Sequence, residues 1–287
     1  MDSKLKNKRR SIAVTLICFN EEDRIKACLE SIVGWADQIV ILDSGSTDKT
    51  LDIAMEYDAE IYLTDWPGYG PQRSRALSKV TCDWVFAIDA DERMTEELKL
   101  EIDQVLSLEV VPCSVYRMPW IPYFIGKKLN YGRYASPQAR LFQKDGAYYP
   151  SAQIHETLIF PPGKVGYLSG GLIHHSFRDY EHCISKHNEY AWLLAKEKYA
   201  KGKKSSLFFA TIRSWWEFVH QFFFRKLFLD GQHGYLQAII LKQYSFHKYA
   251  ALWTLQQTKS KVEPAFLPEH RNPRPEKLNT ENIKRIK

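Results

Sequence analysis

The stretch Val85-Phe86-Ala87-Ile88-Asp89-Ala90-Asp91-Glu92 decides the fold, because an apolar run ends there in three carboxylates within four positions. A short apolar run of this kind is typical of a buried strand. Charges without partners are very costly to bury, so we expect the carboxylates at the exposed carboxyl end of the strand, where open α/β sheets bind ligands. Oxygen ligands on a short turn suit Mg²⁺ or Mn²⁺, which usually complete their coordination with substrate phosphates. The stretch therefore predicts a metal site for a nucleotide diphosphate, the alternative being a solvated turn whose acids cap the next helix.

Strand and helix patterns alternate on both sides of this stretch. We expect strands at residues 12–18, 38–42, 60–63 and 84–88. The helices are expected at residues 21–33, from Ser46 or Thr47 as N-cap to about 57, within 68–79 after a glycine-containing loop, and at 95–106. Strands separated by helices indicate βαβ units, so the predicted fold class is α/β with a largely parallel sheet.

Beyond residue 107 the composition changes. Short strands at 114–118 and 139–143 lie among aromatic, glycine and proline residues and continue the same domain. From about residue 181 the chain becomes helical and basic, with a strongly amphipathic helix predicted at 206–229. The expected organisation is a basic tail (1–10), a domain with two halves (11–107 and 108–180), a helical region (181–262) and a charged, poorly ordered tail (263–287).

Composition excludes several classes of protein. The chain has 287 residues, 45% of them hydrophobic, which excludes a disordered protein. The five cysteines form no Cys-x-x-Cys pair, which argues against a disulfide scaffold and a zinc ribbon and favours a reducing, cytoplasmic setting. No apolar stretch is long enough to span a bilayer. The net charge of +6 favours an anionic partner, either nucleic acid or a membrane surface.

Polar residues follow each of the four predicted strands. Because the carboxyl ends of parallel strands share one edge, these sites should converge on one cleft. The sites are Asn20-Glu21, Asp43-Ser44-Gly45-Ser46-Thr47-Asp48, Gly70-Pro71-Gln72-Arg73 and Asp89-Ala90-Asp91-Glu92. Asp43 could accept hydrogen bonds from a uracil or ribose, while Arg73 and a metal on Asp91 could bind a pyrophosphate. Each site alone is a weak signal, since Asp43 could belong only to a tight turn and Arg73 could be a surface cation.

In this order the motifs resemble the signature of inverting glycosyltransferases of family 2. The usual second motif of that family is Asp-Asp-Gly-Ser, and Ser44 replaces its second Asp here. The resemblance implies a GT-A fold, a Rossmann-like mixed sheet with flanking helices, that binds a nucleotide sugar and Mg²⁺ or Mn²⁺. The donor-binding residues that it implies are Asn20, Glu21, Asp43, Arg73, Asp89, Ala90 and Asp91.

Further motifs are similar to the bacterial lipopolysaccharide inner-core glucosyltransferases of that family. These motifs are Tyr69-Gly-Pro-Gln-Arg73, Arg140-Leu-Phe142, Ile154-His-Glu156, His174-His-Ser-Phe177 and Phe228-Leu-Asp-Gly231. The resemblance implies transfer of glucose from UDP-glucose, with β linkage, to a heptose of the lipid A–core. It also implies a location on the cytoplasmic face of the bacterial inner membrane.

The resemblance also suggests roles for residues on the acceptor side. Glu156 is our candidate catalytic base, although a glutamate at a strand end can be merely exposed. His174 is the candidate metal ligand beside Asp91, with its neighbour His175 as the alternative, and a core histidine as the plainer interpretation. The candidate phosphate or acceptor contacts are Gln72, Arg140, His155, His175 and Lys186, although exposed cations are usually just solvated.

Three alternatives stay open. The amphipathic helix could pack on the sheet instead of lying in a membrane interface. The enzyme could act on an exopolysaccharide, a glycolipid or a protein glycan instead. A basic nucleic-acid-binding protein is a remote third reading, since no RNA-binding signature is present and the acidic strand ends would repel a phosphate backbone; we expect no nucleic-acid partner.

Overall fold

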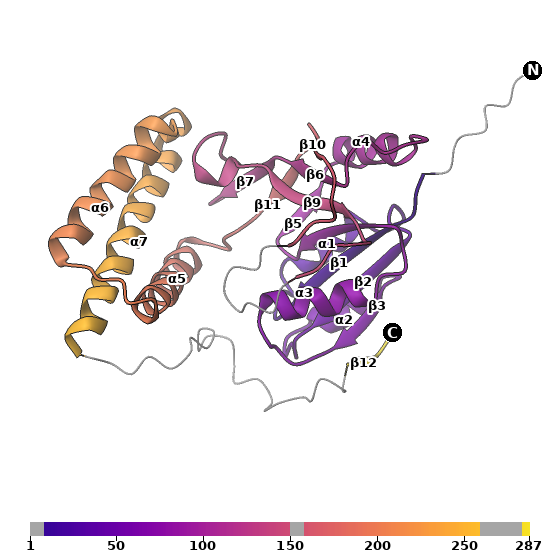
Figure 1. The fold of residues 1–287 in the computed structure, drawn as a ribbon, viewed down its shortest axis with the longest axis horizontal. Coiled ribbons are helices and arrows are strands. Elements are labelled where there is room, and N and C mark those ends of the chain that lie inside the picture. Colours follow the sequence, from indigo (N-terminus) through magenta and orange to yellow (C-terminus); the bar gives the residue numbers. More distant parts are fainter. Residues whose placement is uncertain (1–8, 150–157, 259–282) are drawn as a thin grey trace, which may run out of the picture. The chain divides into compact units, whose positions relative to one another are not determined.

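The computed structural model describes residues 9–149, 158–258 and 283–287, and its internal contacts divide the chain into two compact units (Figure 1). The described part of the first unit comprises residues 9–120, 137–149, 158–174 and 283–287. The described part of the second unit comprises 121–136 and 175–258. The helical region expected from residue 181 thus shares its unit with a segment that lies some fifty residues earlier in the chain.

A mixed sheet of eight strands forms the first unit, in the order β10-β6-β9-β4-β1-β2-β3-β12. Its strands are β1 (Ile12–Cys18), β2 (Gln38–Asp43), β3 (Glu60–Leu63), β4 (Trp84–Asp89), β6 (Val115–Met118), β9 (Gln138–Gln143), β10 (Val165–Tyr167) and β12 (Lys284–Arg285). Strands β1 to β4 run parallel, whereas β9 is antiparallel to β4. The predicted α/β class with a mixed sheet and flanking helices is therefore confirmed.

The register of the parallel strands brings the acidic strand ends together. Asp43 lies opposite Cys18, and Asp89 lies opposite Ile17, so both carboxylates flank the end of β1. The chain order reverses beside β1, because β2 lies on one side of it and β4 on the other. Such a reversal is where open α/β sheets bind their ligands.

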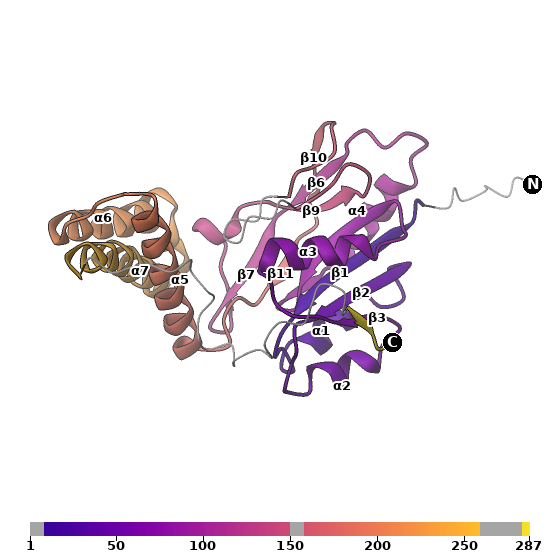
Figure 2. The same cartoon turned by 60° about the horizontal axis from the view of Figure 1, so that its bottom comes forward.

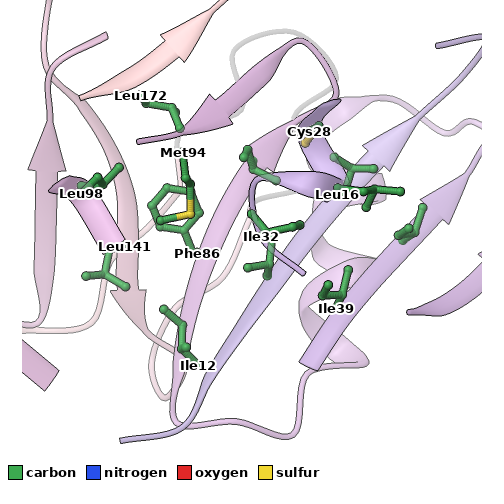
Figure 3. Packing of buried hydrophobic residues seen from close by; sticks show 14 of the residues in the cluster. Ile12, Leu16, Cys28, Ile32, Ile39, Phe86, Met94, Leu98, Leu141 and Leu172 are labelled. Atoms are coloured by element: carbon green, nitrogen blue, oxygen red, sulfur yellow. The ribbon is translucent and has the colours of Figure 1, made fainter. Parts of the chain in front are cut away.

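Two hydrophobic clusters cover the two faces of the sheet, because side chains alternate along each strand. On β1, Ile12, Val14 and Leu16 belong to one cluster, whereas Ala13 belongs to the other. The first cluster includes apolar residues of α1 (Ile25–Glu30), α2 (Thr50–Met55) and α4 (Glu96–Leu106), and Figure 3 shows its packing around Phe86. The second includes residues of α3 (Tyr69–Ser78), which lies across the other face (Figure 2).

The helix after β2 begins later than expected. Ser46 and Thr47 were predicted as N-caps, which is wrong, because α2 begins at Thr50 and the Asp48 carboxylate accepts the Thr50 N–H at 2.9 Å. The Ser46 hydroxyl instead accepts a hydrogen bond from the Asn20 N–H at 2.9 Å. The Ser46 side chain is therefore hydrogen-bonded to the loop between β1 and α1 and does not cap α2.

Two other sequence expectations differ from the structure. The motif Gly70–Arg73 does not form a loop but lies in the first turns of α3, which begins after Gly68 at a φ of 119°. The end of the chain was expected to be poorly ordered, yet Lys284 and Arg285 form β12 and pair antiparallel with β3. Ile283 and Ile286 pack against opposite clusters of the first unit, so their burial anchors this short strand.

The second unit is mainly helical. It contains most of β7 (Trp120–Phe124), β8 (Lys127–Lys128), a 3-10 turn (Arg133–Ala135), α5 (Tyr180–Ala200), α6 (Leu207–Val219), a π-helical turn (His220–Phe224), a second 3-10 turn (Leu227–Asp230) and α7 (Gly231–Thr258). Helix α7 packs against both α5 and α6. The prediction of a single helix at 206–229 is therefore wrong. Helix α6 ends at Val219, and Lys226 has a left-handed backbone conformation with a φ of 61°. Among the described residues, none of the helices is both long and apolar enough to cross a bilayer.

The packing in Figure 3 predicts a large stability effect at the sheet. Phe86 is fully buried, so Phe86→Ala should lower the free energy of unfolding by about 3–5 kcal/mol. The matched control is Leu100→Ala on α4, where the side chain is 62% exposed and the change should stay within about 0.5 kcal/mol. Urea unfolding followed by circular dichroism measures both, and equal losses would contradict this packing.

Candidate active site

Asp89, at the end of β4, lies between two guanidinium groups. Its Oδ1 accepts a hydrogen bond from Arg73 of α3 at 2.7 Å, and its Oδ2 accepts one from Arg140 of β9 at 2.7 Å. Burial by itself would raise the pKa of Asp89, but Arg140 and Arg73 outweigh it and hold that pKa well below its ordinary value. The carboxylate is therefore ionised at every physiological pH, and it fixes the position of both arginines.

Glu92 lies on the buried side of the acidic turn. We expected all three carboxylates at the exposed edge, but the Glu92 side chain is fully buried. Its Oε1 accepts hydrogen bonds from Trp120 Nε1 at 2.7 Å and from Arg140, while its Oε2 accepts the Asp89 N–H at 2.9 Å. These partners compensate the buried charge. Burial raises the pKa of Glu92 despite the opposing effect of Arg140.

Asp91 and His174 lie next to each other. His174 ends β11 (Leu172–His174), which pairs antiparallel with β5 (Glu92–Met94), so His174 stands opposite Glu92. Its Nε2 is 3.5 Å from Asp91 Oδ2, and its ring packs on Trp120 with centroids 4.3 Å apart. Its neighbour His175 stacks instead on Tyr123 of the second unit, with centroids 4.8 Å apart. Of the two candidate histidines, His174 is the one beside Asp91.

The donor set of this pair fits a divalent cation. A carboxylate oxygen and an imidazole nitrogen suit Mn²⁺, and Mg²⁺ is usually bound by one or two carboxylates together with substrate phosphates. Within the described ranges, no group of three or more His, Cys, Asp or Glu side chains is arranged to hold a metal. Asp91 and His174 would thus leave most of the coordination shell to ligand oxygens and water. Ala90 between the two aspartates is buried, so only its backbone could face a ligand.

The loop after β2 is held by its own hydrogen bonds. Asp43 is fully buried, and its Oδ1 accepts the N–H groups of Gly45 and Ser46, both at 2.8 Å. Asn20, at a φ of 53°, accepts the Thr47 N–H at 2.8 Å through its Oδ1. Asp43 and Asn20 therefore shape this loop, and their predicted contact with a nucleoside stays a prediction.

Two further predicted residues are tied to the same loop. The Gln72 amide donates to the Ser44 hydroxyl at 3.0 Å from the buried side of α3. The N–H of Glu21 donates to Thr50 Oγ1 at 2.7 Å, while its carboxylate pairs with Arg24. Arg24 in turn has a guanidinium nitrogen 3.7 Å from Asp91, so the loop after β1 is linked to the acidic turn after β4.

A cavity of about 360 Å³ opens beside the acidic turn. Its lining residues are Arg73, Ala87, Arg117, Gln138, Ala139, Arg140, Tyr149, Leu158 and Phe160. Three guanidinium groups in one cavity suit an anionic ligand. Arg117 was missed by the sequence analysis; its only signal is a cation between the apolar residues of β6, at a position that alternation directs away from Tyr116 and Met118.

Several predicted contacts lie elsewhere. Glu156 and His155 lie outside the described residues; Tyr149 and Leu158, close to that segment on either side, line the cavity. Lys186 belongs to α5 of the second unit, where its ammonium group donates to the Ser176 carbonyl at 3.3 Å. The first unit thus brings together Arg73, Asp89, Asp91, Arg140 and His174.

Comparisons with known proteins identify relatives over most of the chain. Residues 13–150 match the family model described as glycosyl transferase family 2. An uncharacterized glycosyltransferase of Rickettsia typhi is 31% identical over 85% of this chain and 87% of its own length. The lipopolysaccharide core biosynthesis glycosyltransferase LpsC of Rhizobium meliloti is 30% identical over 84% of this chain and 92% of its own.

Solved structures resemble the chain more loosely. S. aureus TarS 1–349 is 13% identical, covering 88% of this chain and 93% of its own, with a TM-score of 0.42. Glucosyl-3-phosphoglycerate synthase from Mycobacterium tuberculosis, in complex with Mn²⁺, UDP and glucosyl-3-phosphoglycerate, is 26% identical over 39% of this chain and 44% of its own, with a TM-score of 0.33.

The two arginines at Asp89 predict a pH-dependent stability effect. Because the pKa of Asp89 is lower in the folded chain, its carboxylate stabilises the fold above about pH 4, and this contribution is lost as the pH falls further. Asp89→Asn should lower the Tm at pH 7 by about 5 °C or more, and the gap from wild type should narrow below about pH 4. The control is Glu96→Gln, whose carboxylate is exposed, and calorimetric scans at several pH values measure both. A gap that stays constant down to pH 3 would contradict this assignment.

Proposed function

Because this chain belongs to glycosyl transferase family 2, we propose that it transfers a hexose, glucose in our assignment, from a UDP-sugar to a hydroxyl of a lipopolysaccharide inner-core heptose. The observation that carries the proposal is the turn after β4, where Asp91 pairs with His174 and Asp89 pairs with Arg73 and Arg140. These two arginines line a cavity together with Arg117. The metal-ligand pair suits the diphosphate of the donor, and the guanidinium groups suit anionic groups of either substrate.

The reaction is a single displacement with inversion at the anomeric carbon. Glu156 takes the proton from the acceptor hydroxyl while the oxygen of that hydroxyl forms the new bond to the anomeric carbon. The bond from the same carbon to the diphosphate oxygen breaks, UDP leaves, and the product has a β linkage. Asp91 and His174 would hold a Mg²⁺ or Mn²⁺ ion, whose chemistry there is to neutralise charge on the departing diphosphate. Tyr149 and Leu158, close to the segment of Glu156 on either side, line the cavity with the three arginines, which supports Glu156 as the base.

The loops after β1 and β2 supply the donor site. Asp43 holds the loop of Gly45 and Ser46 through hydrogen bonds to their N–H groups, and Asn20 fixes the Thr47 N–H. A loop fixed in this way does not have to be ordered when the nucleoside binds, which lowers the entropic cost of binding. Asp89 has the same function for Arg73 and Arg140, since it holds both guanidinium groups before any phosphate arrives.

Two arguments support the acceptor: the similarity of this chain to LpsC and the positive charge of the cavity. LpsC, which aligns with most of this chain, is named for lipopolysaccharide core biosynthesis. Inner-core glycans are anionic, and a cavity with three guanidinium groups is complementary to such an acceptor.

The second unit supplies a surface for peripheral attachment to the cytoplasmic face of the inner membrane. Large apolar side chains on α6 and the π-helical turn are exposed, among them Phe208, Ile212, Trp215, Trp216, Phe223 and Phe224. Exposed cations flank them on both sides, namely Lys203 and Lys204 before α6 and Arg225 and Lys226 after the turn. An exposed aromatic face flanked by cations is typical of helices that lie in the interface of an anionic membrane.

Two variants separate donor binding from transfer. Asp91→Asn should weaken Mn²⁺-dependent binding of UDP-glucose by at least about tenfold, the loss of about 1.4 kcal/mol. Glu156→Gln should bind the donor normally and slow transfer by about 10²–10⁴-fold. Calorimetry and a product assay with deacylated core oligosaccharide measure the two steps, and Asp52→Asn, at an exposed position of α2, is the control. Normal donor binding by Asp91→Asn would refute the metal site, and normal transfer by Glu156→Gln would refute the base.

Sedimentation with vesicles tests the membrane surface. The full chain should bind vesicles that contain anionic phosphatidylglycerol and be released by salt, because counter-charge attraction weakens with ionic strength. The double variant Phe208→Ser, Phe224→Ser should bind at least about tenfold more weakly, since both rings are more than half exposed and free to insert. Leu100→Ser in the first unit is the control. Equal binding by all three proteins would refute this surface.

A further inference from the structure

A cluster of cations lies within the second unit, apart from the residues assigned above. We name Arg133, Lys198, Arg213 and Lys248 the bundle cations; they come from the first 3-10 turn, α5, α6 and α7. The ammonium groups of Lys198 and Lys248 lie 5.8 and 5.0 Å from the centroid of the same Tyr249 ring. Lys248 is also 5.2 Å from the Tyr244 ring. Two helices thus direct their lysines onto one aromatic ring.

The cluster has more positive charge than its neighbours neutralise. Besides burial, the groups that most affect the pKa of Lys248 are three cations, Lys198, Arg213 and Arg133, and one carboxylate, Glu217. Glu217 is shared, since it also accepts a hydrogen bond from Gln221 at 2.9 Å. Burial and the three cations together lower the pKa of Lys248 to about 8, although Glu217 opposes them. Like charges in one cluster repel one another and destabilise the unit unless an anion joins them.

Arg213 provides the second, independent sign of a missing anion. Its Nη1 is buried and has no hydrogen-bond partner, because the nearest carboxylate oxygen, on Glu217, is 3.8 Å away, too far for a hydrogen bond. The guanidinium side chain as a whole is 37% exposed, and Arg133 is exposed as well. A small anion from solvent can therefore reach the guanidinium group of Arg213, which would gain a hydrogen-bond acceptor there.

We propose that the bundle cations form a binding site for a phosphate group, held by Arg213 and Lys248 with Lys198 and Arg133 around it. Arginine offers two parallel N–H donors to a phosphate, and the two lysines add point charges. Tyr244 and Tyr249 form an aromatic floor that orients the ammonium groups by cation–π contact. The phosphate can come from a lipid headgroup or from free phosphate, and either source has the same chemistry at this site.

Titration calorimetry of the full-length protein with two probes tests the site. Inorganic phosphate and monomeric short-chain phosphatidic acid are each added to wild type, Lys248→Gln, Arg213→Gln and Lys242→Gln. Lys242 is the matched control, because it also lies on α7 but places its ammonium group over Trp215 instead. The first two variants should bind about tenfold or more weakly, as expected for one lost charge-assisted hydrogen bond, and the control should bind as wild type does.

The probes also distinguish the two sources of the ligand. Binding of both probes supports a site open to free phosphate, and binding of phosphatidic acid alone supports a lipid headgroup. The proposal is overturned if wild type binds neither probe, or if all three variants lose binding equally. Circular dichroism of each variant without phosphate checks that it is folded. Because the assay contains no nucleotide sugar, its outcome is independent of the proposed transfer reaction.

Proton uptake gives a readout that a purely structural role for the lysine would not change. Near pH 8, Lys248 is about half protonated, and an anion beside it raises its pKa, so binding should draw protons from the buffer. Sulfate, which does not itself titrate there, is the probe, and calorimetry in buffers of different ionisation enthalpy measures the uptake. Lys248→Gln should abolish the uptake and Lys242→Gln should keep it; sulfate binding without uptake by wild type would refute the role of Lys248.

Discussion

The pairing of Asp89 with Arg73 and Arg140 is the interaction on which the first unit's site depends. One acidic side chain ends the otherwise apolar strand β4 and two more follow it closely, and their mutual repulsion would open the turn if no cations paired with them. Arg73 comes from α3 and Arg140 from β9, which reach the turn from different elements of the unit. The pair therefore locks a helix and a strand to the end of β4 while neutralising the cluster.

Glu92 extends this arrangement into the core. It accepts hydrogen bonds from Arg140, from the Trp120 ring and from the backbone of Asp89, and these partners make its burial tolerable. Trp120 in turn packs on His174, whose strand pairs with that of Glu92. The result is a rigid frame around Asp91. A preorganised site of this kind stabilises developing charge without having to rearrange during the reaction.

The two units deal with charge in opposite ways. In the first, cations and carboxylates alternate, and each buried charge described above has a partner. In the second, Arg133, Lys198, Arg213 and Lys248 share Glu217, while the aromatic side chains of α6 remain exposed. Uncompensated charge and exposed apolar surface are unfavourable in a protein that works alone in water. Both features are consistent with a second unit that meets anionic, partly apolar partners.

The sequence by itself determined the strands β1 to β4, the acidic turn and the family, because apolar runs and short motifs are local properties. β1 was predicted to the residue, and α4 was predicted to within one residue of its observed bounds. Local pattern could not reveal that Ser46 would be drawn to Asn20, that Ile283 and Ile286 would add β12 to the sheet, or that α6 would end at Val219. Only the tertiary structure placed His174 rather than His175 beside Asp91, buried Glu92 and brought Arg117 to the cavity. The physical reason is that each of these depends on partners distant in sequence, and the energy of a charge or a hydroxyl is set by the groups that surround it after folding.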